Sequence, residues 1–162
     1  MKLLAPLLLT ATYLLGLFTG CQPAQRDDQP RKIEVIFLGH DSKHHDSYAY
    51  MPMLAQALGK KGIHFTYTSD LNDLNPQKLA AFDALMLYAN HDSIAPAQEA
   101  ALLDFVKGGK GFLPVHCASF CFRNSEEIVA LMGGQFKSHE TGTFTATVTA
   151  PDDPLMAGFQ PF

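Results

Sequence analysis

The sequence has no tryptophan, three cysteines, and twelve lysine and arginine residues among its 162 positions. The absence of tryptophan excludes an indole ring as a stacking platform for a ligand. The basic residues are scattered and the formal net charge is −4, so the chain lacks the clustered positive surface that nucleic acid phosphates require. A chain of this length has room for one domain with a sizeable core, and 47% apolar against 17% charged residues is ordinary globular composition.

The N-terminal region is apolar and has no charged residue between Lys2 and Arg26. This run is short for a bilayer span, and it has the positive start and apolar centre of a secretory signal. It ends with Leu17-Phe18-Thr19-Gly20-Cys21, which resembles a bacterial lipobox. We therefore expect a lipoprotein-type signal peptide over residues 1–21 with lipidation at Cys21, followed by a flexible polar tether over residues 22–32.

An uncleaved N-terminal membrane anchor is the alternative interpretation of the same run. Both interpretations place the domain that we expect over residues 33–162 outside the cytoplasm. The sequence thus predicts a cell-envelope protein, lipid-anchored to a membrane and either periplasmic or surface-exposed.

Hydrophobic periodicity predicts alternating strands and helices through the rest of the chain. The predicted strands are residues 33–38, 64–68, 84–88 and 111–115, and the predicted helices are residues 48–61, a short one opening at 75–76, 95–107 and 125–132. Connections this short imply parallel strands joined by crossovers, and the flavodoxin-like, doubly wound order is the most economical arrangement. The alternating, Thr-rich residues 143–148 predict a solvent-facing edge strand. The predicted fold class is therefore α/β with a mostly parallel sheet.

Six of the seven histidines lie in or beside segments that follow predicted strands, and only His64 begins one. The six are His40, His44, His45, His91, His116 and His139. In open parallel sheets the ligand crevice lies beyond the carboxyl ends of the strands, so residues there can converge from distant positions. A single loop histidine is usually just solvated, but several strand ends carrying one each predict a functional cluster.

Histidine suits two kinds of chemistry at such an edge. It can shuttle protons near neutral pH, or its neutral imidazole can bind zinc or another transition metal. The spacing of His40 and His44 is metal-like but works best on a helix, so a metal site needs His116 or His139 as a further ligand. Nearby carboxylates, Asp41 and Glu140 among them, can orient imidazoles or act as acid and base.

Cys117 follows the fourth predicted strand and is a candidate nucleophile. A nucleophile elbow needs small residues two positions to either side, and Cys117 has Val115 and Ser119 there, so the sequence supports a cysteine hydrolase only weakly. Cys117 and Cys121 lie four residues apart, and in an oxidising compartment the two thiols can either stay free or form a disulfide. The sequence leaves that choice open.

A set of short segments over residues 33–162 resembles the ThuA-like, or trehalose utilisation, family. The matching segments are Gly39-His40-Asp41, Asp70-Leu71-Asn72, Phe82-Asp83-Ala84-Leu85, Phe105-Val106-Lys107-Gly108-Gly109-Lys110-Gly111-Phe112, His116-Cys117-Ala118-Ser119, Gly133-Gly134-Gln135-Phe136-Lys137-Ser138-His139 and Asp153-Pro154-Leu155-Met156-Ala157-Gly158-Phe159. No single segment is specific, but the combination is.

The resemblance implies a fold similar to the class I glutamine amidotransferase domain and a link to sugar metabolism. His40, His116 and His139 match recurrent motif positions of the family. The amidotransferase Cys–His–Glu machinery does not carry over, because no Gly-x-Cys-x-Gly elbow is present. Members of the family also occur fused to dehydrogenase-like and haem-binding modules, which are therefore expected partners. Family members continue past the last matching segment, so we expect the domain to be incomplete at its C-terminus.

These observations leave the enzymatic nature of the chain open between three hypotheses. The first is an enzyme acting on a disaccharide or an oxidised sugar. The catalytic residues expected for this enzyme are His40, Asp41, His116 and His139. The residues expected to bind the substrate are His44, His91, Cys117 and Glu140. A divalent metal such as zinc would bind His40, His116 and His139. The second is a non-catalytic module that binds a carbohydrate or a partner through aromatic residues, for which Tyr48, Tyr50, Tyr88, Phe120 and Phe122 are candidates. The third is a scaffold that has lost its activity.

Overall fold

The strands of the computed structural model form one parallel sheet with the order β2-β1-β3-β4. The structure describes residues 32–143 and 145–159, which belong to one compact unit. The predicted signal peptide, Cys21 and nearly all of the predicted tether lie outside these residues. β1 (Ile33–Gly39) lies between β2 (Ile63–Thr68) and β3 (Ala84–Tyr88), and β4 (Gly111–Pro114) pairs with β3. This order confirms the predicted flavodoxin-like α/β fold.

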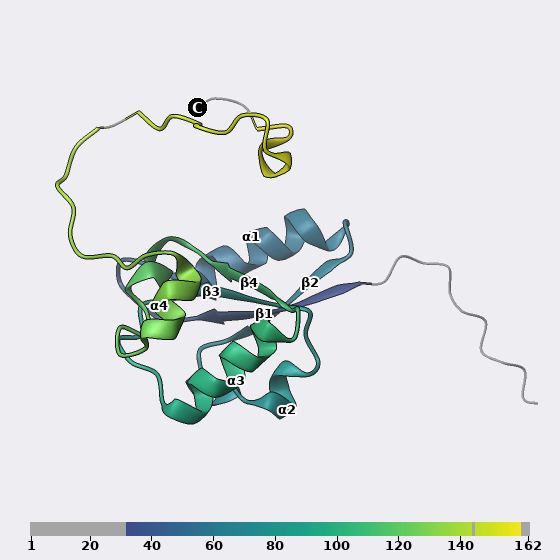
Figure 1. Cartoon of the computed structure of the whole chain (residues 1–162). Coiled ribbons are helices and arrows are strands. Elements are labelled where there is room, and N and C mark those ends of the chain that lie inside the picture. The colour runs from purple at the N-terminus through teal and green to yellow at the C-terminus, as the bar shows by residue number, and fades with distance from the viewer. Residues whose placement is uncertain (1–31, 144, 160–162) are drawn as a thin grey trace, which may run out of the picture. The chain divides into compact units, whose positions relative to one another are not determined.

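The helices lie between the strands, as the periodicity predicts. They are α1 (Ser47–Gly59), α2 (Pro76–Leu79), α3 (Pro96–Lys107) and α4 (Glu126–Met132), with short 3-10 turns η1 (Leu71–Asp73), η2 (His116–Phe120) and η3 (Pro154–Met156). Helix α1 lies on one face of the sheet, and α2 and α3 lie on the other (Figure 1). Within the part of the chain that the structure describes, no helix has the length and apolarity to cross a bilayer.

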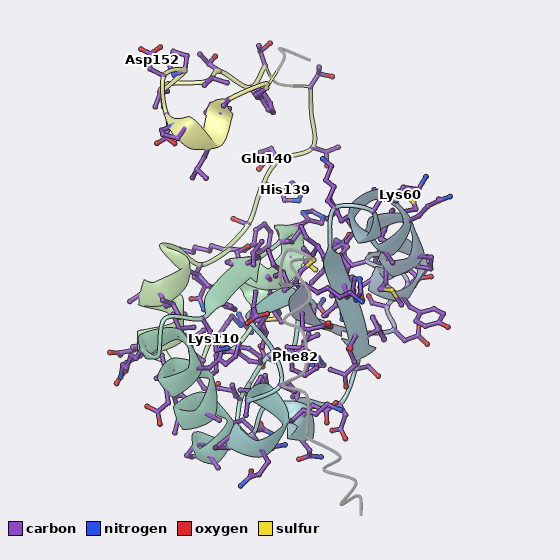
Figure 2. The ribbon with its side chains drawn as sticks, turned by 90° about the vertical axis from the view of Figure 1, so that its right-hand side faces the viewer. Lys60, Phe82, Lys110, His139, Glu140 and Asp152 are labelled. Carbon is purple, nitrogen blue, oxygen red and sulfur yellow. The ribbon has the colours of Figure 1, made fainter. Side chains whose placement is uncertain are left out.

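Local signals fix where these helices begin and end. The Asp46 carboxylate accepts the Ala49 N–H at the start of α1, and the Ser125 hydroxyl accepts the Ile128 N–H at the start of α4. Helix α4 ends at Gly133, which has a φ of +81° and therefore the left-handed conformation that glycine adopts most easily. At the other end of the sheet, the Lys110 ammonium donates to the Phe82 carbonyl at 2.7 Å and ties the start of β4 to the start of β3 (Figure 2).

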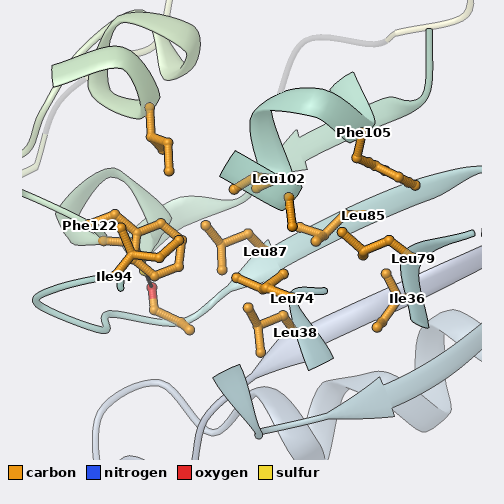
Figure 3. Close-up of a cluster of buried hydrophobic side chains, with 14 of the residues drawn as sticks. Ile36, Leu38, Leu74, Leu79, Leu85, Leu87, Ile94, Leu102, Phe105 and Phe122 are labelled. Atoms are coloured by element: carbon orange, nitrogen blue, oxygen red, sulfur yellow. Dashed lines mark hydrogen bonds between the residues drawn. The ribbon is translucent and has the colours of Figure 1, made fainter. Parts of the chain in front are cut away.

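The main core lies between the sheet and helices α2 and α3 (Figure 3). Side chains of β1 and β3 that point to this face pack against α3 and the segment after η2. They include Ile36, Leu38, Leu85, Leu87, Leu102, Phe105 and Phe122. Side chains alternate along a strand, so the other face of β1 carries Phe37, whose ring contacts the rings of Phe65 and Tyr67 on β2. The sheet is thus buried on both faces at β1, which holds the ends of the strands in fixed positions.

The predicted Thr-rich edge strand is wrong for the residues that can be assessed. Residues 143 and 145–148 form no strand, are exposed, and pair with no part of the four-stranded sheet. An alternating threonine pattern favours an extended backbone, but a strand also requires a neighbour that supplies its backbone hydrogen bonds. None of the described strands supplies them.

Candidate functional site

Three neighbouring strands deliver histidines to the carboxyl edge of the sheet. β1 leads into His40 and the loop that carries His45, β3 is followed by His91, and β4 leads through Val115 into His116. Parallel strands end at the same edge, so these residues meet although they are far apart in the sequence. His64 lies at the opposite edge, where its ring is 3.6 Å from the Glu34 carboxylate. The structure therefore places these histidines at the carboxyl ends of the strands, as the sequence predicted.

Four imidazoles form a continuous series, which we call the imidazole row: His91, His40, His45 and His116. The ring centroids of His91 and His40 are 6.1 Å apart, and those of His40 and His45 are 6.5 Å apart with nearly parallel planes. His45 and His116 are closest, at 4.8 Å and nearly perpendicular. The Tyr88 ring lies beside both of them, at 6.5 Å and 6.0 Å. These separations are those of packed aromatic pairs.

The row runs from the protein interior to the surface. His40 is only 8% exposed, and the Nε2 atoms of His40 and His91 are buried without a hydrogen-bond partner in the described residues. The backbone of His40 is fixed by the buried Ser47 hydroxyl, which accepts the His40 N–H at 2.8 Å and donates to the His40 carbonyl at 2.9 Å. His40 is therefore a rigid, buried member of the row.

Burial favours the neutral form of three of these imidazoles. Desolvation lowers the pKa of His40, His45 and His91 below the ordinary value of 6.5. Charge repulsion acts in the same direction, since His91 further lowers the pKa of His40, and His116, His40 and His44 further lower the pKa of His45. At neutral pH these rings are proton acceptors rather than cations.

The chain turns sharply where β4 meets η2. His116 has a φ of +51°, in the left-handed region that residues with a Cβ rarely occupy. The sequence around it lacks the glycines of an elbow, and the turn forms nonetheless. The next residue, Cys117, is half-buried, and burial raises the pKa of its thiol, which disfavours the thiolate that a nucleophile needs.

The two cysteines of this region, Cys117 in η2 and Cys121 directly after it, are free thiols in this structure. The Cys121 Sγ is buried and donates to the Ala89 carbonyl at 3.0 Å. Burial raises the pKa of Cys121 to about 12. Cys121 is thus a core residue rather than a reactive group.

The outer end of the row opens into a cavity of about 750 Å³. It is lined by His45, Asn90, His116, Cys117, Ser119, Phe120, Phe136, His139 and Glu140. His139 and Glu140 belong to the segment after α4 (Figure 2), which is joined to η2 by a hydrogen bond from the Phe136 N–H to the Ser119 carbonyl at 2.9 Å. The cavity thus has an imidazole wall from the strand ends and an aromatic wall from Phe120 and Phe136.

The structure separates the predicted site residues into three groups. His116, Cys117, His139 and Glu140 line the cavity. His40 and His91 lie behind the cavity in the row, and Asp41 and His44 are exposed residues that do not line it. Sequence reasoning did not select His45, Asn90, Ser119 and Phe136 as site residues. His45 was one of the six strand-end histidines, but nothing in the loop sequence distinguishes it from His44.

The predicted zinc ligands do not converge. The His45 ring lies between the rings of His40 and His116 and contacts both of them. The His139 ring packs on Phe136, with ring centroids 5.6 Å apart. Across residues 32–143 and 145–159, no three histidine, cysteine, aspartate or glutamate side chains are placed to hold a metal ion. Metal binding by His40, His116 and His139 therefore stays a prediction.

The sheet order and the strand-end site define a flavodoxin-like α/β protein. The family model for ThuA, described as trehalose utilisation, matches residues 34–162, and the chain belongs to this family. A solved structure of a ThuA-like protein from Bacteroides uniformis ATCC 8492 is similar at 20% identity with a TM-score of 0.49, over 70% of this chain and 48% of that one. The chain thus spans about half the length of that protein. Comparison with curated proteins found no match. The family description connects the chain with carbohydrate use.

Proposed function

We propose that this chain is an exported ThuA-family domain that moves protons on a disaccharide or an oxidised sugar bound at the strand ends. The observation that supports this most directly is the pair formed by His45 and His116. Both residues line the cavity, and their ring centroids are 4.8 Å apart. Two imidazoles on one cavity wall are suited to acid–base chemistry near neutral pH.

The two histidines have different surroundings, which suggests different roles. His45 packs against the buried His40, and burial together with the neighbouring imidazoles lowers its pKa, so the His45 ring is neutral at pH 7 and available to accept a proton. A ring nitrogen of His45 takes the proton of a carbon next to a sugar carbonyl, and the electron pair of the broken C–H bond forms the double bond of an enediolate. His116 then serves as the acid that supplies a proton to a sugar oxygen.

The substitutions His45→Gln and His116→Ala are each expected to lower turnover by about 100-fold, because each removes one partner of the proton transfer. Turnover is measured by NMR, as deuterium incorporation from D₂O into a ketose such as fructose. Since the pKa of His45 is lowered, the loss of rate caused by protonation of this base should begin only below pH 6.5.

His64→Gln is the matched control, because His64 lies at the opposite edge of the sheet. Equal rates for the His45, His116 and His64 variants would contradict the proposed acid–base pair. If the unaltered protein binds trehalose but incorporates no deuterium into fructose, the result favours the non-catalytic binding module instead. The aromatic wall of the cavity is the feature that favours that alternative.

We further propose that the domain is exported and held at a membrane by lipid on Cys21. The support is the sequence of residues 1–21, with Lys2, an apolar centre and a lipobox-like ending. In a bacterial host, Cys21→Ala should move the protein from the membrane fraction to the soluble or precursor fraction, as followed by immunoblot. Cys117→Ala is the control and should leave the distribution unchanged. Membrane association that survives Cys21→Ala would indicate an uncleaved apolar anchor.

A further inference from the structure

The aromatic wall of the cavity consists of two phenylalanine rings that have no role in the proposed proton transfer. Phe120, the last residue of η2, and Phe136, from the segment after α4, have ring centroids 6.4 Å apart at an angle of 53°. Phe136 is 39% exposed, so its ring can reach a ligand in the cavity. The backbone hydrogen bond from Phe136 to Ser119 brings the two rings together. Two aromatic rings meeting at an angle form a concave apolar corner.

The Phe120 ring is held from outside the cavity. The guanidinium of Arg123 lies 4.3 Å from the centre of the Phe120 ring, in a cation–π contact. The Asp92 carboxylate in turn accepts from Nε and Nη2 of Arg123, at 2.9 and 2.6 Å. The backbone N–H of Arg123 also donates to the Asp92 carbonyl at 3.0 Å. Arg123 is therefore fixed at both its backbone and its side chain, and it occupies one face of the Phe120 ring.

The chemistry of the lining selects a kind of ligand. The imidazoles and Asn90 add hydrogen-bonding groups to the lining, and its one charged side chain is the carboxylate of Glu140, with no lysine or arginine beside it. A ligand that matches this arrangement has an apolar face, a rim of hydroxyl groups and no phosphate or carboxylate. An uncharged pyranose fits, because its C–H face packs on aromatic rings and its hydroxyls bond to polar groups. The volume of about 750 Å³ is in the range of pockets that take ligands larger than a single small ring.

We propose that Phe120 and Phe136 form a stacking subsite for one ring of an uncharged disaccharide, and that Arg123 and Asp92 are positioning residues for the Phe120 ring. This inference rests on the proposed carbohydrate function and adds the residues that orient the sugar. The chain has no tryptophan, and in this subsite two phenylalanine rings supply the stacking surface that an indole ring would otherwise provide. A sugar ring held on this corner presents its hydroxyl rim to His45 and His116.

The test is binding of trehalose and maltose to the full chain, measured by isothermal titration calorimetry. Phe120→Ala and Phe136→Ala are each expected to weaken binding by about 10-fold, the size of one good aromatic contact. Phe120→Leu and Phe136→Leu keep apolar volume but lose the flat face, so they should weaken binding in the same direction with little effect on folding. Phe159→Ala is the control at a half-exposed phenylalanine that does not line the cavity, and it should bind like the unaltered chain.

A double-mutant cycle tests the role of Arg123. Arg123→Gln should weaken disaccharide binding in the unaltered chain but have no further effect in the Phe120→Ala background, because its effect acts through the ring. An equal effect of Arg123→Gln in both backgrounds overturns the positioning role. Glucose 6-phosphate serves as the anionic probe, and tighter binding of this ligand than of trehalose overturns the preference for an uncharged sugar.

The two proposals fail in different ways. Disaccharide binding that is the same in the phenylalanine variants and the unaltered chain overturns the stacking subsite and leaves the carbohydrate function standing. Absence of any binding or turnover of sugars by the unaltered chain overturns both. In turnover assays the phenylalanine variants should raise KM more than they lower kcat, whereas the His45 and His116 variants should lower kcat.

Discussion

Replacing Phe122 by alanine is expected to lower the free energy of unfolding by about 3–5 kcal/mol. The Phe122 side chain is fully buried in the main core (Figure 3). Its ring stacks on His91, with centroids 6.5 Å apart. Truncation leaves a void beside both the core and the imidazole row, which surrounding side chains can fill only in part. The measurement is urea unfolding followed by far-ultraviolet circular dichroism, since the chain has no tryptophan for fluorescence.

Two further substitutions separate packing from backbone strain at this position. Phe122→Leu preserves most of the volume and should cost less than about 1.5 kcal/mol. Phe122 has a φ of +56°, so Phe122→Gly should be more stable than Phe122→Ala by about 1 kcal/mol, the reverse of the usual order. A loss below about 1 kcal/mol for Phe122→Ala would be incompatible with the packing described.

Gly39→Ala should destabilise the fold by about 3 kcal/mol, the upper end of what overpacking usually costs. Gly39 ends β1, and a methyl group there would lie 2.6 Å from the Tyr67 ring carbon Cε2 and closer still to the Ser47 hydroxyl. Ser47 is fully buried and has no room to retreat. Its hydroxyl holds both backbone groups of His40, so the same methyl group should displace His40 from the row.

Urea unfolding measures the first effect, and the chemical shifts of the histidine ring protons report the second. Gly59→Ala is the matched control, because no atom lies within 4 Å of the added methyl and the residue ends α1. That variant should be unchanged or more stable, by up to about 1 kcal/mol. If Gly39→Ala unfolds at the same urea concentration as the unaltered chain, the close approach of β1 to Ser47 is wrong.

The architecture could be predicted from the sequence because its signals are local. Apolar runs with strand period, helical spacing between them, and stops such as Gly62, Gly108 and Gly133 are each contained within a few residues. Short connections then leave few ways to arrange the strands. The Thr-rich residues 143–148 mark the limit of this reasoning. Their pattern indicates which backbone conformation they favour, but a strand needs a partner that lies elsewhere in the chain.

The candidate site was predicted less well, since its members are chosen by the fold rather than by their neighbours. The loop after β1 carries His40, His44 and His45, and the resemblance to a family favoured His40 as a catalytic residue. The structure buries His40, exposes His44 and places His45 in the cavity lining, which depends on how Ser47 and Tyr88 pack around the loop.

His116 and Phe136 illustrate the same point from two other segments. The sharp turn at His116 could not be predicted, because the residues around it lack glycine and the contacts of β4 and η2 impose the conformation. Phe136 reaches the cavity through one backbone hydrogen bond to Ser119, and no pattern in the sequence marks that contact.

The imidazole row also makes the site depend on how much of the sheet has assembled. Its contacts close chain loops of very different length: His40 and His45 are near neighbours in sequence, His91 lies beyond β3, and His116 lies beyond β4. Closing a longer loop costs more chain entropy, so the contact of His45 with His116 is the costliest to form. A partly folded chain in which β4 has not joined the sheet would hold His40 against His45 but would have no cavity. The site is therefore complete only when the last strand of the sheet is in place.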